Sequence, residues 1–147
     1  MPPVPRTEGP DSDGFYTTFF DDSGFNGIFG PIHSRAEGNV ARVRIETGLA
    51  RGNPMGALHG GFLLAFLDQA VFVGGVVLGR LGLPNWAVTL GFSTQFVAPG
   101  RVDVPLDCMV EIVSETGKLM FQRGQLEQEG RALLIFQATL RKVRFGS

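Results

Sequence analysis

One long segment near the middle of the chain is almost entirely apolar. Between Arg51 and Arg80 the sequence runs through two apolar blocks, Phe62 to Leu67 and Ala70 to Val73. A surface helix carries one apolar stripe, whereas this segment has apolar residues in nearly every direction around a helix. The pattern therefore predicts a long helix that starts near Gly60-Gly61 and is buried on nearly all sides.

His59 and Asp68 are the only ionisable side chains in this segment. Burying an unpaired carboxylate is costly, so Asp68 must be hydrogen-bonded, paired with a cation, protonated or directed at a cavity. On this observation alone a structural and a functional role are equally open. The segment is long enough to span a bilayer. The central carboxylate, the five glycines between Gly60 and Gly79 and the strand-like sequence that follows favour the core helix of a soluble protein.

Strand-like alternation surrounds this helix. Before it, two short runs within residues 32–46 flank the turn-forming triplet Glu37-Gly38-Asn39, and Ala41, Val43 and Ile45 share one face of the second run. After the helix, turn sequences separate four alternating runs, residues 86–97, 102–113, 119–127 and 132–143. We therefore expect an α+β fold with two strands, one long buried helix and an antiparallel meander of four strands.

The run over residues 86–97 alternates between large apolar side chains and small or polar ones. One face of the expected strand carries Val88, Leu90, Phe92 and Phe96, and the opposite face carries Thr89, Gly91, Ser93 and Gln95. Successive side chains of a strand point to opposite faces of its sheet. The sequence thus predicts that Thr89 and Phe92 lie on opposite faces.

The N-terminal region changes character at Phe15. Residues 1–14 are rich in Pro, Asp and Ser, which predicts a flexible tail, and residues 15–147 have the length of a single domain. Five phenylalanines follow between Phe15 and Phe29, too many for a solvated loop. Phe15 and Phe19 have the spacing of one helix face. We expect a short helix or lid that packs on the body of the protein, or alternatively lines an apolar ligand pocket.

Composition and charge narrow the function classes. The 147 residues are 44% hydrophobic and 18% charged, which is typical of a globular protein. A formal net charge of −1 gives no global attraction to nucleic acid or to an anionic membrane. The single cysteine, Cys108, excludes an intrachain disulfide, and two histidines exclude a three-histidine metal site within one subunit. The N-terminus shows no secretory signal pattern, so we expect a cytoplasmic protein.

A set of residues at the start of the central helix resembles a known motif. Asn53, His59, Gly60, Gly61 and Asp68 fit the spacing Asn-x5-His-Gly-Gly-x6-Asp without gaps. In this the chain resembles the hotdog-fold acyl-CoA thioesterases, specifically the branch related to the phenylacetate-pathway thioesterase within the 4-hydroxybenzoyl-CoA thioesterase superfamily. The resemblance extends from about residue 35 to the C-terminus. It implies a hotdog fold, in which an antiparallel sheet wraps around one long central helix.

The resemblance also implies roles for individual residues. The backbone N–H of Gly60, aided by Asn53, is expected to bind the thioester carbonyl. Asp68 is expected to act as nucleophile or as general base for water, and the hydroxyl of Thr89 to help hold that water. His59 is expected to hold the loop at the helix start. A second branch of the superfamily carries a hydroxyl one turn after the acid, where this chain has Phe72.

The physics of a helix N-terminus agrees with these roles. Free N–H groups and the positive end of the helix dipole suit a developing oxyanion, and glycine permits close approach of a substrate. Gly60 and Asp68 are eight residues apart, which is about 12 Å along an α-helix. One carbonyl cannot touch both in the same helix. If both act on it, a second protomer supplies one of them, and the site straddles a dimer interface.

We therefore expect a homo-oligomeric acyl-CoA thioesterase, a homodimer or a homotetramer formed as a dimer of dimers. Coenzyme A is expected as part of the substrate and not as a retained cofactor, with Arg101 as a candidate for its phosphates. Nucleic acid, membranes and metals are not expected as partners. Two alternatives stay open: a hotdog hydratase or dehydratase acting on acyl thioesters, and a non-catalytic acyl-CoA-binding hotdog module. Acyl length, and alkyl or aryl character, are not specified by the sequence.

Overall fold

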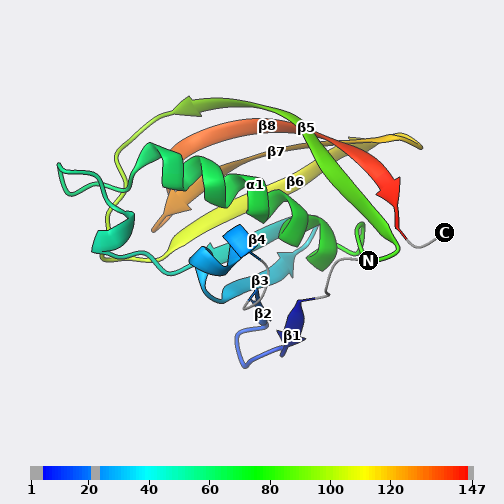
Figure 1. Cartoon of the computed structure of the whole chain (residues 1–147), viewed down its shortest axis with the longest axis horizontal. Coiled ribbons are helices and arrows are strands. Elements are labelled where there is room, and N and C mark those ends of the chain that lie inside the picture. Colours follow the sequence, from blue (N-terminus) through cyan, green and yellow to red (C-terminus); the bar gives the residue numbers. More distant parts are fainter. Residues whose placement is uncertain (1–4, 21–23, 146–147) are drawn as a thin grey trace.

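The computed structural model describes residues 5–20 and 24–145. Within them one long helix lies against one face of a strongly curved antiparallel sheet (Figure 1). In chain order the elements are β1 (Arg6–Glu8), β2 (Tyr16–Phe19), the 3-10 helix η1 (Gly24–Phe29), β3 (Ile32–Glu37), β4 (Val40–Ile45), the 3-10 helix η2 (Leu49–Arg51), α1 (Gly60–Val77), β5 (Asn85–Phe96), β6 (Leu106–Glu115), β7 (Leu119–Gln128) and β8 (Arg131–Arg144). This is the sheet-around-helix layout that the sequence predicted.

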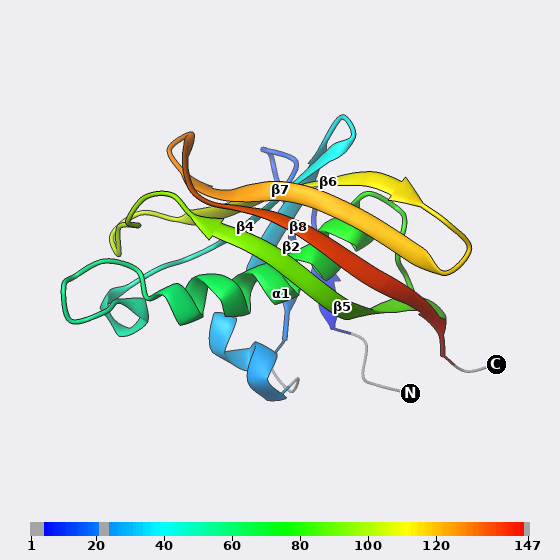
Figure 2. The same cartoon turned by 90° about the horizontal axis from the view of Figure 1, so that it is seen from above.

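The order of strands in the sheet differs from the expected meander. Among the described residues the order is β1-β2-β3-β4-β6-β7-β8-β5, with every neighbouring pair antiparallel. Of the four strands that follow α1, only β6, β7 and β8 are joined as a meander. After α1 the chain forms the far edge strand β5 beside β8, and then crosses to place β6 next to β4 (Figure 2). Alternation of side chains predicts that a strand exists but not which strand is its neighbour.

Strand β5 contains a β-bulge that shifts its side-chain pattern. The pairing with β8 passes from Thr89↔Leu140 to Gly91↔Thr139, so Leu90 has no partner. The extra residue reverses the alternation beyond it. Phe92 pairs with Ala138, which is buried like Leu140, so Thr89 and Phe92 lie on the same, inner face. The predicted opposite placement of Thr89 and Phe92 is therefore wrong.

Helix α1 is buried on one broad side and open on another. Its buried residues face the sheet and are Leu63, Phe66, Leu67, Ala70, Val71, Val73, Gly74 and Gly75. Leu64 and Val76 are 39% and 44% exposed, and Asp68 is exposed between them. The prediction of a helix buried on nearly all sides is thus wrong for the single chain. By length and composition α1 also meets the criteria for a bilayer span, but its buried side belongs to the protein core.

The N-terminal region is built differently from the expectation. Arg6–Glu8 pairs with β2 as a strand instead of belonging to a loose tail, whereas residues 1–4 of that expected tail lie outside the described residues. Phe19 belongs to β2 and not to a helix shared with Phe15, because Tyr16–Phe19 pairs with β3. Phe20 and Phe29 are buried in the core. Phe15 is also buried, at 7% exposure, so three of the five phenylalanines act as core packing.

Candidate active site

The carboxylate of Asp68 is held by one hydrogen bond from the neighbouring strand. Thr89, on β5, donates its hydroxyl Oγ1–H to Asp68 Oδ1 at 2.9 Å. The bond is short enough to fix the rotation of the carboxylate. Asp68 is exposed, and its second oxygen, Oδ2, accepts no hydrogen bond from the described residues. The structure thus brings Asp68 and Thr89 together as one half of the candidate site.

Asn53 organises the loop that leads into the helix. Its side-chain oxygen Oδ1 accepts hydrogen bonds from the backbone N–H groups of Met55, at 2.9 Å, and Ala57, at 3.1 Å. The backbone N–H of Asn53 also donates to the Ala57 carbonyl at 2.7 Å. These bonds use the carbonyl end of the Asn53 amide. Its NH₂ end makes no hydrogen bond to the described residues and is free to donate.

The two glycines at the start of α1 have different neighbours. His59 is the N-cap, and its Nδ1 accepts from the Gly61 N–H at 2.8 Å. A Cβ on Gly61 would lie only 3.0 Å from His59 Nδ1, so a side chain there would require the imidazole to shift by a few tenths of an ångström. The Gly60 N–H, in contrast, has no partner within the described part of the chain. His59 therefore occupies one terminal N–H of the helix and leaves the preceding one for a ligand.

Asn53 and Gly60 line a common cavity of about 360 Å³. The other lining residues are Ala57, Leu58, Leu63, Phe96, Val97, Ala98, Pro99 and Gly100. Asp68 and Thr89 do not line it, since eight residues of helix, or about 12 Å, separate Asp68 from Gly60. The sequence-predicted residues thus form two half-sites on each chain.

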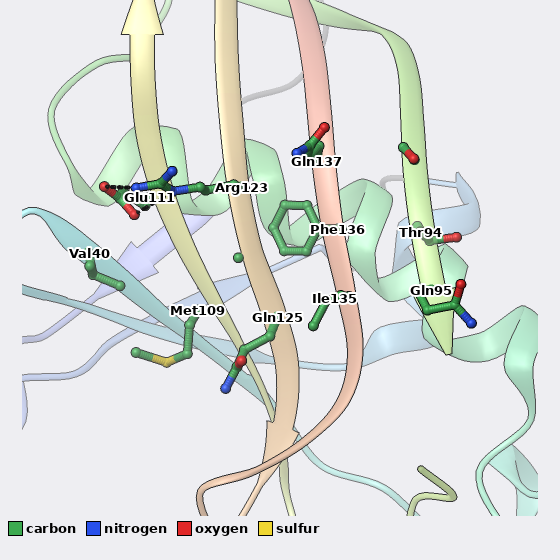
Figure 3. Close-up of a pocket in the computed structure, with 12 residues that line it drawn as sticks. Val40, Thr94, Gln95, Met109, Glu111, Arg123, Gln125, Ile135, Phe136 and Gln137 are labelled. Atoms are coloured by element: carbon green, nitrogen blue, oxygen red, sulfur yellow. Dashed lines mark hydrogen bonds and ion pairs between the residues drawn. The ribbon is translucent and has the colours of Figure 1, made fainter. Parts of the chain in front are cut away.

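A second hollow lies on the outer face of the sheet, away from α1. It measures about 580 Å³ and is lined from β4 to β8 and β5 by residues that include Val40, Met109, Gln125 and Ile135 (Figure 3). The Glu111–Arg123 ion pair, 3.0 Å long, closes one side. None of the five sequence-predicted catalytic residues lines this hollow. We therefore place the candidate site on the helix side.

Comparison with known sequence families identifies the family of this chain. The sequence model of a family described as the thioesterase superfamily matches residues 55–135. This is more than half of the chain. The chain belongs to the thioesterase superfamily. A search among curated proteins gives no match.

Solved structures place this thioesterase-superfamily chain in the hotdog fold. A thioesterase from Haemophilus influenzae superposes with a TM-score of 0.69 at 16% identity over 79% of this chain and 80% of its own. A hypothetical thioesterase from Streptococcus pneumoniae, solved with coenzyme A, gives 0.63 at 22% over 76% and 86%. The PaaI protein of the Escherichia coli phenylacetic acid degradation operon gives 0.65 at 19% over 79% and 80%. The predicted fold, superfamily and class of thioester hydrolase are confirmed.

Arg101 lies near the half-site of this thioesterase-superfamily chain but is already engaged. Its guanidinium forms two hydrogen bonds to Asp103, at 3.0 and 2.8 Å. This ion pair raises the pKa of Arg101 above its ordinary value. Ala57 and Arg101 form an isolated β-bridge, so Arg101 is beside the loop that leads to Gly60. Binding of CoA phosphate by Arg101 stays a prediction, and it requires competition with Asp103.

Sequence reasoning missed two residues that shape the site. Arg51 donates to the backbone carbonyls of Glu46 and Ile28 and stacks over the ring of Phe62 at 5.1 Å, and burial lowers its pKa. It thereby fixes the loop just before Asn53. The Phe96 ring lies against Gly60. Side-chain alternation did not predict this contact, because the bulge in β5 changes the face on which Phe96 lies relative to Thr89. Neither has a motif that identifies it.

The position that carries a hydroxyl in the second branch is filled here by an aromatic stack. Phe72, one turn after Asp68, stacks on Trp86 with ring centroids 5.9 Å apart and planes 14° from parallel. Offset stacking of this kind is a favourable arrangement for aromatic rings. The stack supplies no hydroxyl, so Thr89 is the hydroxyl that contacts Asp68 here. The described residues also contain no group of three or more His, Cys, Asp or Glu side chains arranged to hold a metal ion.

Proposed function

We propose that this chain is a soluble, cytoplasmic acyl-CoA thioesterase that acts as a homodimer, or as a dimer of such dimers, with each active site shared by two copies. The reaction releases a free acid and coenzyme A, and CoA is substrate rather than cofactor. One observation carries the proposal. Asp68 with Thr89 lies midway along α1, whereas Asn53 and the free Gly60 N–H lie at its start.

The exposed surface around Asp68 supports a second copy as the partner. Leu64 and Val76, on the open side of α1, are 39% and 44% exposed. Exposed apolar patches of this kind mark association sites. Strand β5 is also an edge of the sheet, and unpaired edges invite strand pairing. A copy seated here covers the apolar residues and brings its own Gly60 toward Asp68.

In the shared site the two halves have complementary chemistry. The carbonyl oxygen of the thioester accepts hydrogen bonds from the Gly60 N–H and the Asn53 NH₂ of one copy, at the positive end of the helix dipole. Asp68 of the other copy either attacks the carbonyl carbon or removes a proton from a water that attacks it, with Thr89 holding the reacting oxygen atoms in place. The C–S bond then breaks and the CoA thiolate takes up a proton. If Asp68 is the nucleophile, the acyl group is left on its carboxylate as a mixed anhydride, and a water hydrolyses this anhydride to release the acid and restore Asp68.

Two further observations support thioester hydrolysis by these residues. The Streptococcus pneumoniae protein was solved with coenzyme A and also as two variants, in which an aspartate and a threonine are replaced by alanine. Asp and Thr are the residue types of the Asp68–Thr89 pair. A hydratase instead needs a histidine paired with an acid, and in this chain Nδ1 of His59 is occupied by the Gly61 N–H.

Mixed dimers test the shared site. Asn53→Asp keeps the side-chain oxygen that accepts from the loop and loses the NH₂ donor, and Asp68→Asn removes the carboxylate at nearly constant shape. Each homodimer is impaired at both sites, but a mixed dimer has one intact site. Random reassortment makes about half the dimers mixed, so about a quarter of parental thiol release returns after the two variants are refolded together.

The controls distinguish failure of the shared site from absence of thioesterase activity. Mass spectrometry confirms that mixed dimers form, and each variant refolded alone sets the baseline. Mixed dimers with no activity above that baseline would contradict the shared site. A parent protein that binds acyl-CoA but releases no thiol from any member of an alkyl and aryl acyl-CoA panel would instead identify a non-catalytic binding module.

A further inference from the structure

The cavity beside Gly60 has one polar end and an otherwise apolar wall. Asn53 and the backbone of Gly60 provide the polar end, and the remaining lining side chains carry no charge. Leu58 and Leu63, on either side of the helix start, are 4% and 3% exposed. A volume of about 360 Å³ is within the range of small-molecule sites. The cavity therefore suits an apolar group attached to a hydrogen-bond acceptor.

Two structural features border the cavity. On one side, Gly100 packs so tightly on Leu58 and Leu133 that a Cβ on Gly100 would lie 2.8 and 2.9 Å from their side chains. At its rim, the Phe96 ring lies against the helix start, with Cε1 3.4 Å from the position of a Cβ on Gly60. Phe96 pairs with Leu134 on β8, so its backbone is fixed. The side at Gly100 is tightly packed, whereas the Phe96 ring is 47% exposed, so its replacement disturbs little of the core.

The two arms of an acyl-CoA thioester have opposite requirements. The CoA arm carries phosphates, and placing them against uncharged apolar walls without a cation is unfavourable. The acyl arm is apolar and gains free energy from the same walls. With the carbonyl oxygen on the Gly60 N–H, only the acyl arm fits inward, and the CoA arm extends to solvent.

We infer that this cavity is the acyl subsite, and that the Phe96 ring limits the length of the acyl chain it accepts. This inference rests on the proposed function. It names the substrate class as acyl groups with a short or medium apolar body. The phenylalanines of residues 15–29, for which lining an apolar ligand pocket was the alternative expectation, do not line this cavity.

Binding of S-alkyl-CoA thioethers tests the subsite without turnover. Titration calorimetry with the ethyl, butyl, hexyl, octyl and decyl thioethers is expected to show affinity rising about three- to fourfold per methylene until the cavity is filled, and then levelling. Phe96→Ala moves this levelling to longer chains, and Phe96→Trp moves it to shorter ones. The matched control is Phe25→Ala, at a 66% exposed phenylalanine of η1, which leaves the profile unchanged.

Each outcome decides one question. The subsite is overturned if Phe96→Ala changes the thioether affinity by one common factor at every chain length. It is also overturned if Phe25→Ala shifts the length at which affinity levels off as far as Phe96→Ala does. Circular dichroism of each variant checks that the fold is intact. Thioethers that bind with the expected profile while no acyl-CoA is hydrolysed would overturn the thioesterase proposal and keep the subsite. If acyl-CoA is hydrolysed but the preferred chain length is the same in the parent and in the Phe96 variants, the thioesterase proposal is kept and the subsite is overturned.

Discussion

At the scale of single residues, the hydrogen bond from Thr89 gives the two oxygens of the Asp68 carboxylate different roles. Oδ1 accepts from the hydroxyl, and Oδ2 remains available to a water or to a carbonyl carbon. A carboxylate that is fixed in this way needs little reorganisation before it reacts. The interaction thus gives Thr89 a positioning role that does not depend on which of the two mechanisms Asp68 follows.

Replacing Asp68 by Asn is expected to remove most activity while leaving the fold intact. The change conserves shape and exposes no core residue, because Asp68 lies on the open side of α1. Loss of a positioned base costs about 10²- to 10⁴-fold in turnover. Thiol release from a responsive acyl-CoA gives the rate, and thermal unfolding gives the stability. If the variant keeps its rate within a few-fold of the parent, Asp68 has only a structural role.

The sequence predicted part of this site and not the rest. The positions of Gly60 and Asp68 on one helix follow from apolar continuity and from helical rise, so their separation could be calculated. The location of Phe96 could not, because one unpaired residue, Leu90, changes the face on which every later β5 side chain lies. Alternation assumes an uninterrupted ladder, and nothing in the residues 86–97 identifies the interruption.

At the scale of elements, a charged network on the outer face ties β3 and β4 to β6 and β7. Arg42 contacts Glu37 at 2.7 Å, Asp107 at 2.6 Å and Glu127 at 3.3 Å. The hydrogen bond from Arg42, followed by that from Arg35, lowers the pKa of Glu37 from 4.5 to about 2. Such networks are worth more than isolated surface pairs because several charges share one geometry.

Glu37→Gln is expected to destabilise the protein by about 1–2 kcal/mol at neutral pH, after allowance for the solvent that reaches this side chain. The folded-state pKa lies below the unfolded value, so the contribution of Glu37 is complete above pH 4.5 and is lost as the pH falls toward 2. Urea unfolding of parent and variant across this range measures the difference. The difference in free energy of unfolding between parent and variant should become smaller as the pH is lowered.

Asp103→Asn provides the matched control for this prediction. Asp103 also pairs with an arginine, Arg101, but both side chains are more than 60% exposed. Its replacement should leave the stability of the protein essentially unchanged at every pH. A difference for Glu37→Gln that persists unchanged down to pH 2 would mean that ionisation of Glu37 is not its source.

Element order was the part of the fold that the sequence could not supply. The hairpin of β3 and β4 was predictable because Glu37-Gly38-Asn39 forces a tight turn between two alternating runs. The position of β5 beside β8 depends on contacts between residues about 50 apart in the chain. Local alternation contains no information about such pairs, so the resemblance to a known fold was the only guide.

At the scale of the whole molecule, the proposed dimer has a symmetry that can be tested at one position. In a two-fold dimer, Gly60 of each copy meets Asp68 of the other. The axis then passes opposite the midpoint of these two positions, which is Leu64. Leu64 lies on the same helix face, at i+4 from Gly60 and i−4 from Asp68, and is 39% exposed. The two copies of Leu64 should therefore be neighbours.

Leu64→Cys is expected to give efficient crosslinking of two copies by a short bismaleimide, detected by denaturing gel electrophoresis. Native Cys108 does not compete, because it is fully buried and its burial raises its pKa well above the ordinary value. Lys118→Cys, in the exposed turn between β7 and β6, is the control and should stay uncrosslinked. A dimeric protein in which the Leu64→Cys thiols fail to crosslink would require a different relative placement of the two helices.

The bulge in β5 has a consequence for how relatives of this chain should be aligned. Leu90 has no partner on β8. A chain that lacked this residue could therefore keep all the other β5–β8 pairs in register. The fold therefore does not dictate the number of residues between the hydroxyl that contacts the acid and the aromatic ring beside the helix start. In an alignment with a chain that has no bulge here, the gap therefore belongs at position 90.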